Sequence, residues 1–547
     1  MRRRIGQYLM DCLSNVGVDK VFGVPGDFNL TFLDDIIGRT DMEWIGNTNE
    51  LNASYAADGY ARMKGISAMV TTFGVGELSA VNGIAGAFAE RVPVIQITGA
   101  PTQAVEQAGK FVHHSLGEGY FDDYRKMYEP ITTTQAYITE ANAQLEIPRV
   151  INAALTESRP VHIHLPIDVA AKEIEVMEDY HYKMSKPADV SQYIDMVQAK
   201  LNSAERPVII TGHEINSFGL HELLEQFVNQ TGIPVAQLSL GKGAFNEESP
   251  YYMGIYDGSI AEERIKYYVD HSDAILNIGA KLTDSATAGF SYQFDIDDVI
   301  MLNHRNFKMN ETRDDNVALQ DLLIGLQSID FHFNGDYPMF KKPVPNDDVL
   351  DDTPLTQQTY FKMMQDFLNR DDVVIAEQGT SFFGAYDLAL TKTNKFIGQP
   401  LWGSIGYTLP ATLGSQLADG ERRNVLLIGD GSLQLTVQEM ATMIRLQLKP
   451  VIFIINNDGY TVERKIHGEN ALYNDIPMWD YKALPSVFGG NETVSVHEVD
   501  SSVSLQHAFN EINLQPNRMH VIEVKMGMHD APEKLNDIGK AFAKQNG

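Results

Sequence analysis

Cysteine is almost absent from this chain, which carries a single one, Cys12, among 547 residues. One cysteine excludes an internal disulfide framework and is typical of a reducing compartment, so we expect a cytoplasmic protein. Cys12 shares the apolar side of the first expected helix with Leu9 and Leu13. That position favours buried packing over a reactive thiol.

Long hydrophobic runs are missing as well. No stretch of about 18 consecutive apolar residues occurs, so we expect no membrane partner. The chain starts MRRRIGQYLMDCL, where a basic cluster is followed by apolar positions that Gln7 and Asp11 interrupt. This pattern predicts an amphipathic helix and not a signal peptide.

Positive charge is scarce. The chain has 43 Lys and Arg against 73 Asp and Glu, a formal net charge of −30. Such an acidic balance argues against nucleic-acid partners, because a protein that binds phosphate backbones needs clustered cations. It carries little information about a substrate, since a well-solvated surface explains it equally well.

Two segments rich in charge and proline, roughly 171–205 and roughly 336–356, divide the chain into thirds. A prior of about 150 residues a domain gives about three to four domains for this length. The hydrophobic content of 44% provides for large buried cores. We therefore predict domains at 1–182, 183–345 and 346–547.

The first and last thirds repeat one pattern. Residues 71–99 and 427–457 both read as strand, glycine turn, helix and strand, which indicates duplicated doubly wound α/β domains. The middle third adds buried runs of the parallel-strand type at 207–215, 233–238 and 273–284. The sequence thus predicts an α/β fold of three doubly wound parallel-sheet domains.

The most informative motif is GDGS at 429–432, followed by an Asn-Asn pair at 456–457. A strand before the motif and a helix and strand after it form a βαβ unit, so both clusters fall at the carboxyl ends of neighbouring parallel strands. Asp430, Asn457 and a backbone carbonyl in the 458–459 turn offer hard oxygens that suit Mg²⁺. Gly431 and the helix after it suit a phosphate. A purely structural turn is the alternative.

The stretches GDGSLQLTVQEM and NNDGYTVER resemble the diphosphate-binding motif of thiamine diphosphate (ThDP) enzymes. Among these enzymes the chain is similar to the pyruvate, indolepyruvate and branched-chain 2-keto-acid decarboxylases, from VFGVPGDFNL to the last helix. The resemblance implies pyrimidine, middle and diphosphate domains, with ThDP and Mg²⁺ as cofactors. It makes Asp430, Asn457 and the Gly459 carbonyl the metal ligands. Because the cofactor bridges two subunits in that family, it also implies at least a homodimer, commonly a homotetramer.

The resemblance assigns further cofactor contacts. Asn49 reads as the N-cap of a helix and Glu50 as its first-turn acid, and by resemblance Glu50 activates the aminopyrimidine ring through N1′. In the loop 402–406, Gly403 would accept from the 4′-amino group and Ile405 would hold the two rings in a V shape. Ordinary core packing remains open for Ile405. The other implied cofactor contacts are Thr380, Gly431, Ser432, Tyr460 and Thr461.

Adjacent histidines are poor core residues, since two buried imidazoles need several partners, and an ordinary surface loop is the alternative. His113 and His114, with Asp27 in GVPGDFN and Glu463 in GYTVER, match the proton-handling residues of pyruvate-type decarboxylases. Once CO₂ leaves, a carbon must gain a proton and an alcohol must lose one to release aldehyde. Clustered imidazoles and carboxylates suit that work. With Glu50, these four are the expected catalytic residues.

The resemblance also places an acyl pocket, with a carboxy-terminal helix closing over it. Phe382, beside small residues around Ala286, favours substrates larger than pyruvate, either branched or aromatic. The expected pocket residues are Gln378, Phe382, Val462, Ile466, Ile538 and Phe542.

We therefore predict a non-oxidative 2-keto-acid decarboxylase that yields aldehyde and CO₂ from branched-chain, aromatic or straight-chain 2-keto acids. A pyruvate-preferring enzyme is one alternative. A carboligase of the acetolactate synthase type is another, but the histidine pair and the lack of a GxGxxG in the middle third disfavour it, and we interpret that third as a spacer. A non-catalytic filament or regulatory subunit is disfavoured because Glu50 and the metal ligands are present. The middle third has no cysteine, which puts in doubt the substrate activation attributed to one in related decarboxylases.

Overall fold

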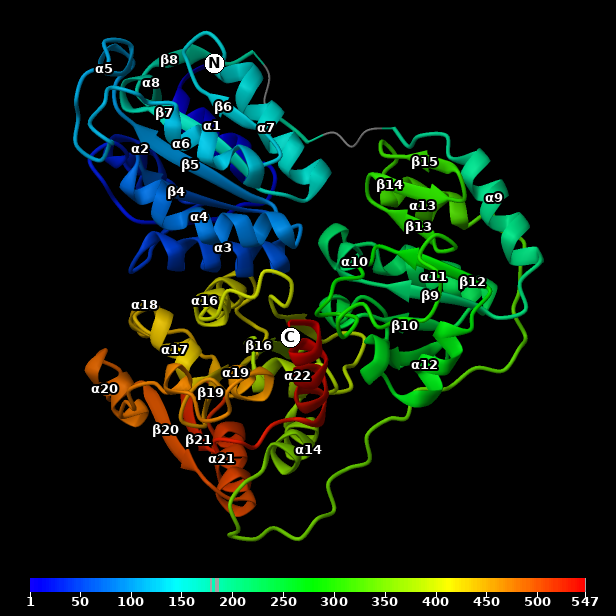
Figure 1. Cartoon of the computed structure of the whole chain (residues 1–547). Helices are drawn as coiled ribbons and strands as arrows, with labels where there is room; N and C mark the ends of the chain where they lie inside the picture. Colours follow the sequence, from blue (N-terminus) through cyan, green and yellow to red (C-terminus); the bar gives the residue numbers. More distant parts are fainter. Residues whose placement is uncertain (178–179, 183–185, 547) are drawn as a thin grey trace.

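The computed structural model describes residues 1–177, 180–182 and 186–546 and arranges them in three α/β lobes (Figure 1). Each lobe is built on a mostly parallel sheet, so the predicted fold of three parallel-sheet domains is confirmed. Among the described residues, no helix is both long and apolar enough to cross a bilayer.

The amino-terminal lobe has a wholly parallel six-stranded sheet between two apolar layers. Phe22 and Met69 point to one layer, while Val21 and Val70 point to the other, as the period of two along a strand requires. In sheet order the strands are β3 (Glu43–Gly46), β2 (Lys20–Gly23), β4 (Ser67–Thr72), β5 (Val94–Ala100), β7 (Val161–Pro166) and β6 (Gln135–Tyr137). The helices are α1 (Ile5–Ser14), α2 (Leu30–Ile37), α3 (Glu50–Lys64), α4 (Val75–Ala89), α5 (Gln103–Gln107), α6 (Asp123–Tyr128), α7 (Ala143–Glu157) and α8 (Ile167–Ala170).

The carboxy-terminal lobe repeats this topology, which supports the duplication predicted from the sequence. Both sheets place their strands in the order second, first, third, fourth, sixth, fifth along the chain. Here the strands are β17 (Lys395–Ile397), β16 (Val373–Ala376), β18 (Asn424–Gly429), β19 (Val451–Asn456), β21 (Met519–Lys525) and β20 (Val494–Val499). The helices include α14 (Gln357–Phe367), α15 (Thr380–Ala385), α16 (Thr408–Ala418), α17 (Asp430–Thr436), α18 (Glu439–Arg445), α19 (Thr461–Ile466), α21 (Ser502–Leu514) and α22 (Glu533–Asn546).

The middle lobe has a seven-stranded sheet that is parallel except for its last two strands. In sheet order the strands are β11 (Tyr252–Ile255), β10 (Val235–Gln237), β9 (Pro207–Thr211), β12 (Ala274–Ile278), β13 (Ile300–Asn303), β14 (Asn306–Met309) and β15 (Thr312–Asp314). The helices are α9 (Ser191–Asn202), α10 (His213–Phe218), α11 (His221–Thr231), α12 (Glu263–Asp270) and α13 (Leu319–Leu326).

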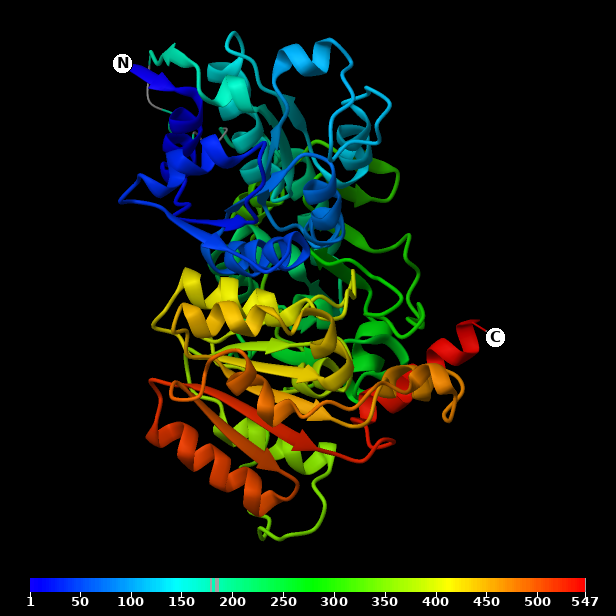
Figure 2. The ribbon, with the colours of Figure 1, turned by 90° about the vertical axis from the view of Figure 1, so that its left-hand side faces the viewer.

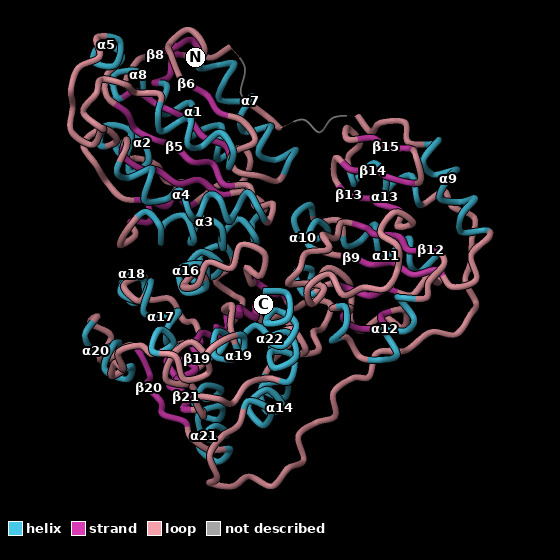
Figure 3. Tube along the Cα trace, in the orientation of Figure 1, coloured by secondary structure: helices cyan, strands magenta, loops and turns pink. Residues whose placement is uncertain are grey.

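The segments between the lobes differ in character. Residues 336–356 carry no helix or strand and run as a long loop (Figure 3). The other predicted linker, 171–205, contains all of α9 and a short strand, β8 (Glu173–Glu175). The predicted domain boundary after residue 182 borders residues 183–185, which lie outside the described part of the chain.

The start of the chain departs from the predicted helix. Arg2–Arg4 forms a strand, β1, that pairs antiparallel with β8, and the helix begins only at Ile5. The pairing explains the difference, because β8 offers backbone partners that the sequence alone does not reveal. Cys12 is fully buried in α1, as predicted.

Helices α3 and α16 bring the first and last lobes together (Figures 1 and 2). Glycines permit their close approach: a Cβ on Gly59 would lie 2.2 Å from the Ala411 carbonyl oxygen, and one on Gly414 would lie 1.8 Å from that of Ala56. The buried Tyr407 hydroxyl donates to Asp58 across this interface. The two lobes therefore share one continuous apolar core.

Candidate functional site

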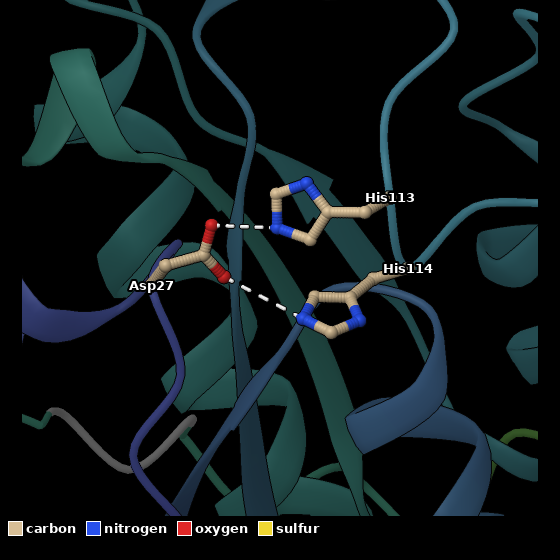
Figure 4. A group of neighbouring side chains, drawn as sticks. All are labelled: Asp27, His113 and His114. Atoms are coloured by element: carbon tan, nitrogen blue, oxygen red, sulfur yellow. Dashed lines mark hydrogen bonds and ion pairs between the residues drawn. The ribbon is translucent and has the colours of Figure 1, made fainter.

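Two loops at the carboxyl edge of the first sheet bring together Asp27, His113 and His114 (Figure 4). The Nε2 atom of His113 lies 2.8 Å from Asp27 Oδ2, and that of His114 lies 3.6 Å from Asp27 Oδ1. The imidazole centroids are 4.5 Å apart, and Phe28 stacks on His113 at 5.0 Å. Both imidazoles thus face one half-exposed carboxylate, which suits them to pass protons to and from a bound molecule.

The backbone of the histidine loop is seated on a glycine. Gly74 has φ +64°, and a Cβ there would lie 1.7 Å from the His114 carbonyl oxygen, so only glycine fits. The Gly74 N–H donates to Glu77 Oε1 at 2.9 Å, and the other oxygen of this buried carboxylate lies 3.0 Å from His162 Nε2. Burial lowers the pKa of His162. A buried polar network therefore fixes the turn at Gly74, against which the backbone of His114 rests.

Glu50 is the first residue of α3, and Asn49 caps this helix by accepting the Asn52 N–H at 2.8 Å. Gly76 lies shortly after the end of β4, and a Cβ on it would lie 3.2 Å from Glu50 Oε1. Gly26, beside Asp27, is close to the last residue of β4, because a Cβ on Gly26 would lie 2.5 Å from the Thr72 side chain. The Glu50 carboxylate therefore lies at the end of β4, at the same sheet edge as the loop of Asp27. The structure brings Glu50 and the Asp27 cluster to one side of the first lobe.

The second half of the site lies at the carboxyl edge of the last sheet. Asp430, the first residue of α17, is 1% exposed and accepts three backbone N–H groups: Gly431 at 2.7 Å, Asn457 at 3.1 Å and Gly459 at 3.2 Å. Burial raises the pKa of its carboxyl to about 6. A Cβ on Gly459 would lie 2.2 Å from the Asn474 carbonyl oxygen, so the turn needs glycine. The structure thus unites the three predicted metal-binding residues.

The polar groups around Asp430 fit a metal-bound diphosphate. Within the described part of the chain, the Asn457 side chain makes no hydrogen bond, which leaves its oxygen free to bind a cation. The Gln378 Oε1 and Ser381 Oγ atoms are buried without partners among the described residues. Polar atoms left unpaired in this way are costly unless a bound molecule satisfies them. The predicted contacts Thr380, Ser432 and Thr461 are likewise buried at this edge.

The predicted pocket residues gather around α19 and α22. Phe382, Val462, Ile538 and Phe542 belong to one apolar cluster. Phe382 is 2% exposed, and Val462 in the same cluster is half-buried. Ile466, at the end of α19, is half-buried and outside this cluster of described residues.

The small residue predicted near Phe382 is a different alanine. Ala286 packs into the core of the middle lobe, and Ala288 joins the cluster of Phe382 instead. Ala288 has φ +46°, so an irregular backbone shifts which residue of this loop faces the cluster. Sequence position alone does not give that register.

Glu463 projects from the first turn of α19. Glu463 is an exposed residue. The surrounding protein nevertheless desolvates its carboxyl in part, and this raises the pKa of the carboxyl. A carboxyl that holds its proton at a higher pH than usual is suited to proton transfer.

The loop 402–406 rests on a carboxylate that the sequence did not reveal. Glu377 Oε2 accepts from the Thr408 hydroxyl at 2.7 Å and from the backbone N–H groups of Thr408 and Gly406, both at 3.2 Å. Burial raises the pKa of Glu377 to about 7. Glu377 directly follows the strand β16 and precedes Gln378, and that position at a strand end is the one signal that could have found it.

The same loop is tied to the first lobe. The Tyr55 hydroxyl on α3 lies 2.5 Å from Ser404 Oγ, and the Trp402 indole donates to Asn82 at 2.9 Å. Gly403 has φ +65°, a conformation that orients its carbonyl differently from that of an extended chain. Ile405 is half-buried in this loop.

Polar contacts do not join the two half-sites within the described part of the chain. Among the described residues, no hydrogen bond or ion pair joins the Asp27–His113–His114 cluster or Glu50 to Asp430, Asn457 or Glu463. Each half is instead flanked by exposed apolar side chains: Phe111, Leu116 and Tyr120 beside the first, and Leu472, Tyr473 and Trp479 beside the second.

Comparison with known proteins matches all three lobes. Residues 3–123 match the N-terminal TPP binding domain of the thiamine pyrophosphate enzymes, residues 194–323 the central domain and residues 379–524 the C-terminal TPP binding domain. The chain is 38% identical to pyruvate decarboxylase isozyme 1 of Saccharomyces cerevisiae over 99% of both proteins. It is 39% identical to pyruvate decarboxylase of Kluyveromyces lactis over 99% of both. It is 38% identical to alpha-keto-acid decarboxylase of Mycobacterium leprae, over 99% of this chain and 96% of that protein.

Proposed function

The chain belongs to the thiamine pyrophosphate (ThDP) enzymes and, within them, to the pyruvate and alpha-keto-acid decarboxylases; from this premise we propose that it releases CO₂ from branched or aromatic 2-keto acids to form aldehydes. The observation that carries the reaction type is the Asp27–His113–His114 cluster, a set of proton carriers that a non-catalytic member of this fold would not need. Small side chains at the acyl cluster, Ala288 and Val462, support a substrate larger than pyruvate.

The residues at the edge of the last sheet suit the cofactor. Asp430, Asn457 and the Gly459 carbonyl would hold Mg²⁺, and Gly431, Ser432, Thr380, Tyr460 and Thr461 would contact the diphosphate. When bound, ThDP supplies a nucleophilic carbon and an electron sink, which the loss of CO₂ from a 2-keto acid requires.

The protein's own groups hold and move the protons. Asp27 orients His113 through the 2.8 Å contact and lies near His114, so the three can deliver a proton to the carbon left after CO₂ departs and accept one from the alcohol. Glu463, with its raised pKa, would serve as a second carrier beside the substrate. Glu50 would assist ionisation of the cofactor through the pyrimidine ring.

A second copy of the chain would complete the site. Among the described residues no polar contact joins the half-sites, and each is flanked by exposed aromatic or aliphatic side chains of the kind that interfaces bury. We therefore propose a homodimer at least, and a homotetramer as its common form in the family. The single, buried Cys12 is in keeping with a cytoplasmic location.

The test of the function is a panel of 2-keto acids supplied with Mg²⁺ and ThDP. We expect aldehyde and CO₂ in equal amounts from 3-methyl-2-oxobutanoate, 4-methyl-2-oxopentanoate and phenylpyruvate, with lower kcat/KM on pyruvate. Formation of a carbon–carbon bond between two keto acids as the main reaction would favour a carboligase instead. Absence of turnover with ThDP bound would favour a regulatory role.

Substrate preference should respond to Val462, which is half-buried in the cluster of Phe382 and faces Gly379. We expect Val462→Phe to shift the ratio of kcat/KM values about 10–200-fold toward pyruvate and against 3-methyl-2-oxobutanoate, since a few methylenes of pocket space are worth about 1–3 kcal/mol. Steady-state kinetics on both substrates measures this ratio. Equal losses on the two would show that Val462 does not border the acyl group.

Protons and Mg²⁺ should compete for Asp430. Its pKa is raised from 3.8 to about 6, so in the metal-free protein its stability contribution is fully present below about pH 4 and is lost as the pH rises toward 6. Mg²⁺ binds the ionised carboxylate and offsets this loss. We therefore expect Mg²⁺ with ThDP to raise Tm more at about pH 7.5 than at about pH 5. Thermal scans at both values check this, and an equal rise at both would contradict it.

A further inference from the structure

Proton transfer does not explain the full geometry of the Asp27–His113–His114 cluster. One nitrogen from each imidazole and one carboxylate oxygen all lie within 4.8 Å of one another. The Nε2 atoms of both imidazoles contact the Asp27 carboxylate, one at each of its two oxygens (Figure 4). Such convergence is what a metal ion needs from its ligands.

The ligand types match zinc. Tetrahedral Zn²⁺ with bonds of about 2.0–2.1 Å sets its ligand atoms about 3.3 Å apart. The contacts of 2.8 Å and 3.6 Å run to different oxygens of Asp27, Oδ2 and Oδ1. One ligand atom from each residue lies within 4.8 Å of the others, so the side chains must close in by up to about 1.5 Å to seat the ion. Two imidazoles and a carboxylate form an open zinc set with a fourth position for water. Mg²⁺ prefers an all-oxygen octahedron and would not compete.

The cluster is both held in place and open to solvent. Gly74 fixes the backbone at His114, which has φ +63°, and Phe28 stacks on His113 with the ring planes 24° apart. The side chains of His113, Asp27 and His114 are 61%, 47% and 34% exposed. An ion can therefore reach the three ligands without being transferred into the protein interior, and only side chains have to move to bind it.

We propose that Asp27, His113 and His114 form a Zn²⁺ site whose occupation inhibits the enzyme. The ion takes the Nε2 lone pair of each imidazole and an oxygen of the carboxylate, so none of the three can accept or deliver a proton. Binding depends on the cluster alone, whereas the inhibition rests on the proposed function.

The test titrates Zn²⁺ into the holoenzyme, saturated with Mg²⁺ and ThDP, and follows binding by calorimetry and turnover by aldehyde release. We expect one Zn²⁺ per chain, loss of turnover at the same concentrations, and no displacement by further Mg²⁺. Co²⁺ used in place of Zn²⁺ should give the visible absorption of an ion with fewer than six ligands. His113→Gln and Asp27→Asn should each weaken binding by at least about 10–100-fold.

His497→Gln is the matched control. His497 Nε2 lies 3.4 Å from His520 Nδ1, so this is another close histidine pair, but no carboxylate hydrogen-bonds to either imidazole among the described residues. Zn²⁺ binding should be unchanged in this variant. Equal affinity in wild type, His113→Gln and Asp27→Asn would overturn the site, as would displacement of Zn²⁺ by Mg²⁺. Because calorimetry needs no turnover, Zn²⁺ bound at the cluster of a protein inactive on 2-keto acids would refute the proposed function and leave the metal site standing.

Discussion

Asp430→Ala should weaken ThDP binding in the presence of Mg²⁺ by an order of magnitude or more, with the fold intact. The carboxylate is the one charged metal ligand expected in this set, and it also accepts the N–H groups of Gly431, Asn457 and Gly459. Its removal leaves those donors unpaired, so at about pH 5, where the carboxyl still holds its proton, we also expect a stability loss of about 1–3 kcal/mol. Calorimetry of ThDP binding and urea unfolding measure the two effects.

Asp458→Asn is the control for that variant. Asp458 is an exposed acid in the same turn, and asparagine tolerates its φ of +58°. The substitution removes one negative charge near the site without removing a proposed ligand, so ThDP affinity should stay within a few-fold of wild type. Wild-type affinity in Asp430→Ala would refute the metal assignment.

Glu50→Gln should leave ThDP bound but slow exchange of the cofactor's C2 proton by roughly 10²-fold or more, the loss typical of removing acid–base assistance. Gln keeps the size of the side chain and the helix cap at Asn49, so the effect reports on the carboxyl group alone. NMR of hydrogen–deuterium exchange at C2 in the bound cofactor measures it.

Glu43→Gln provides the comparison for Glu50. Glu43 lies on β3 in the same lobe, where its contact with Lys20 at 3.5 Å is exposed. Such surface pairs contribute about 0–1 kcal/mol, so neither exchange nor binding should change. Exchange at the wild-type rate in Glu50→Gln would remove the activating role.

The sequence predicted the sheets well, because buried parallel strands read as continuous apolar runs. Val451–Asn456 is such a run. In both 71–99 and 427–457, a glycine turn and a helix precede the second apolar run. The identical strand order of the two outer sheets follows from that repeated unit. The motifs that end these strands then place Asp430 and Asn457 together without knowledge of side-chain packing.

Two buried carboxylates that join segments distant in sequence could not be predicted. Glu439 accepts from Asn47 at 2.8 Å, although 392 positions separate them, and it also accepts from Thr48. Glu377 is satisfied by Thr408 and Gly406, 31 and 29 positions away. These contacts depend on how lobes and loops pack, and no local spacing in the chain encodes them. The prediction that Ala286 lies beside Phe382 was wrong for the same reason, since Ala288 takes that place.

The central claim is that one active site is built from the first lobe of one copy and the last lobe of another. Mixing the inactive variants Glu50→Gln and Asp430→Ala after reversible dissociation tests it most directly. Mixed dimers would hold one site with both residues intact, so random pairing should restore about a quarter of wild-type aldehyde release. If each chain formed its own site, every site would lack one residue, and the mixture would stay as inactive as its components.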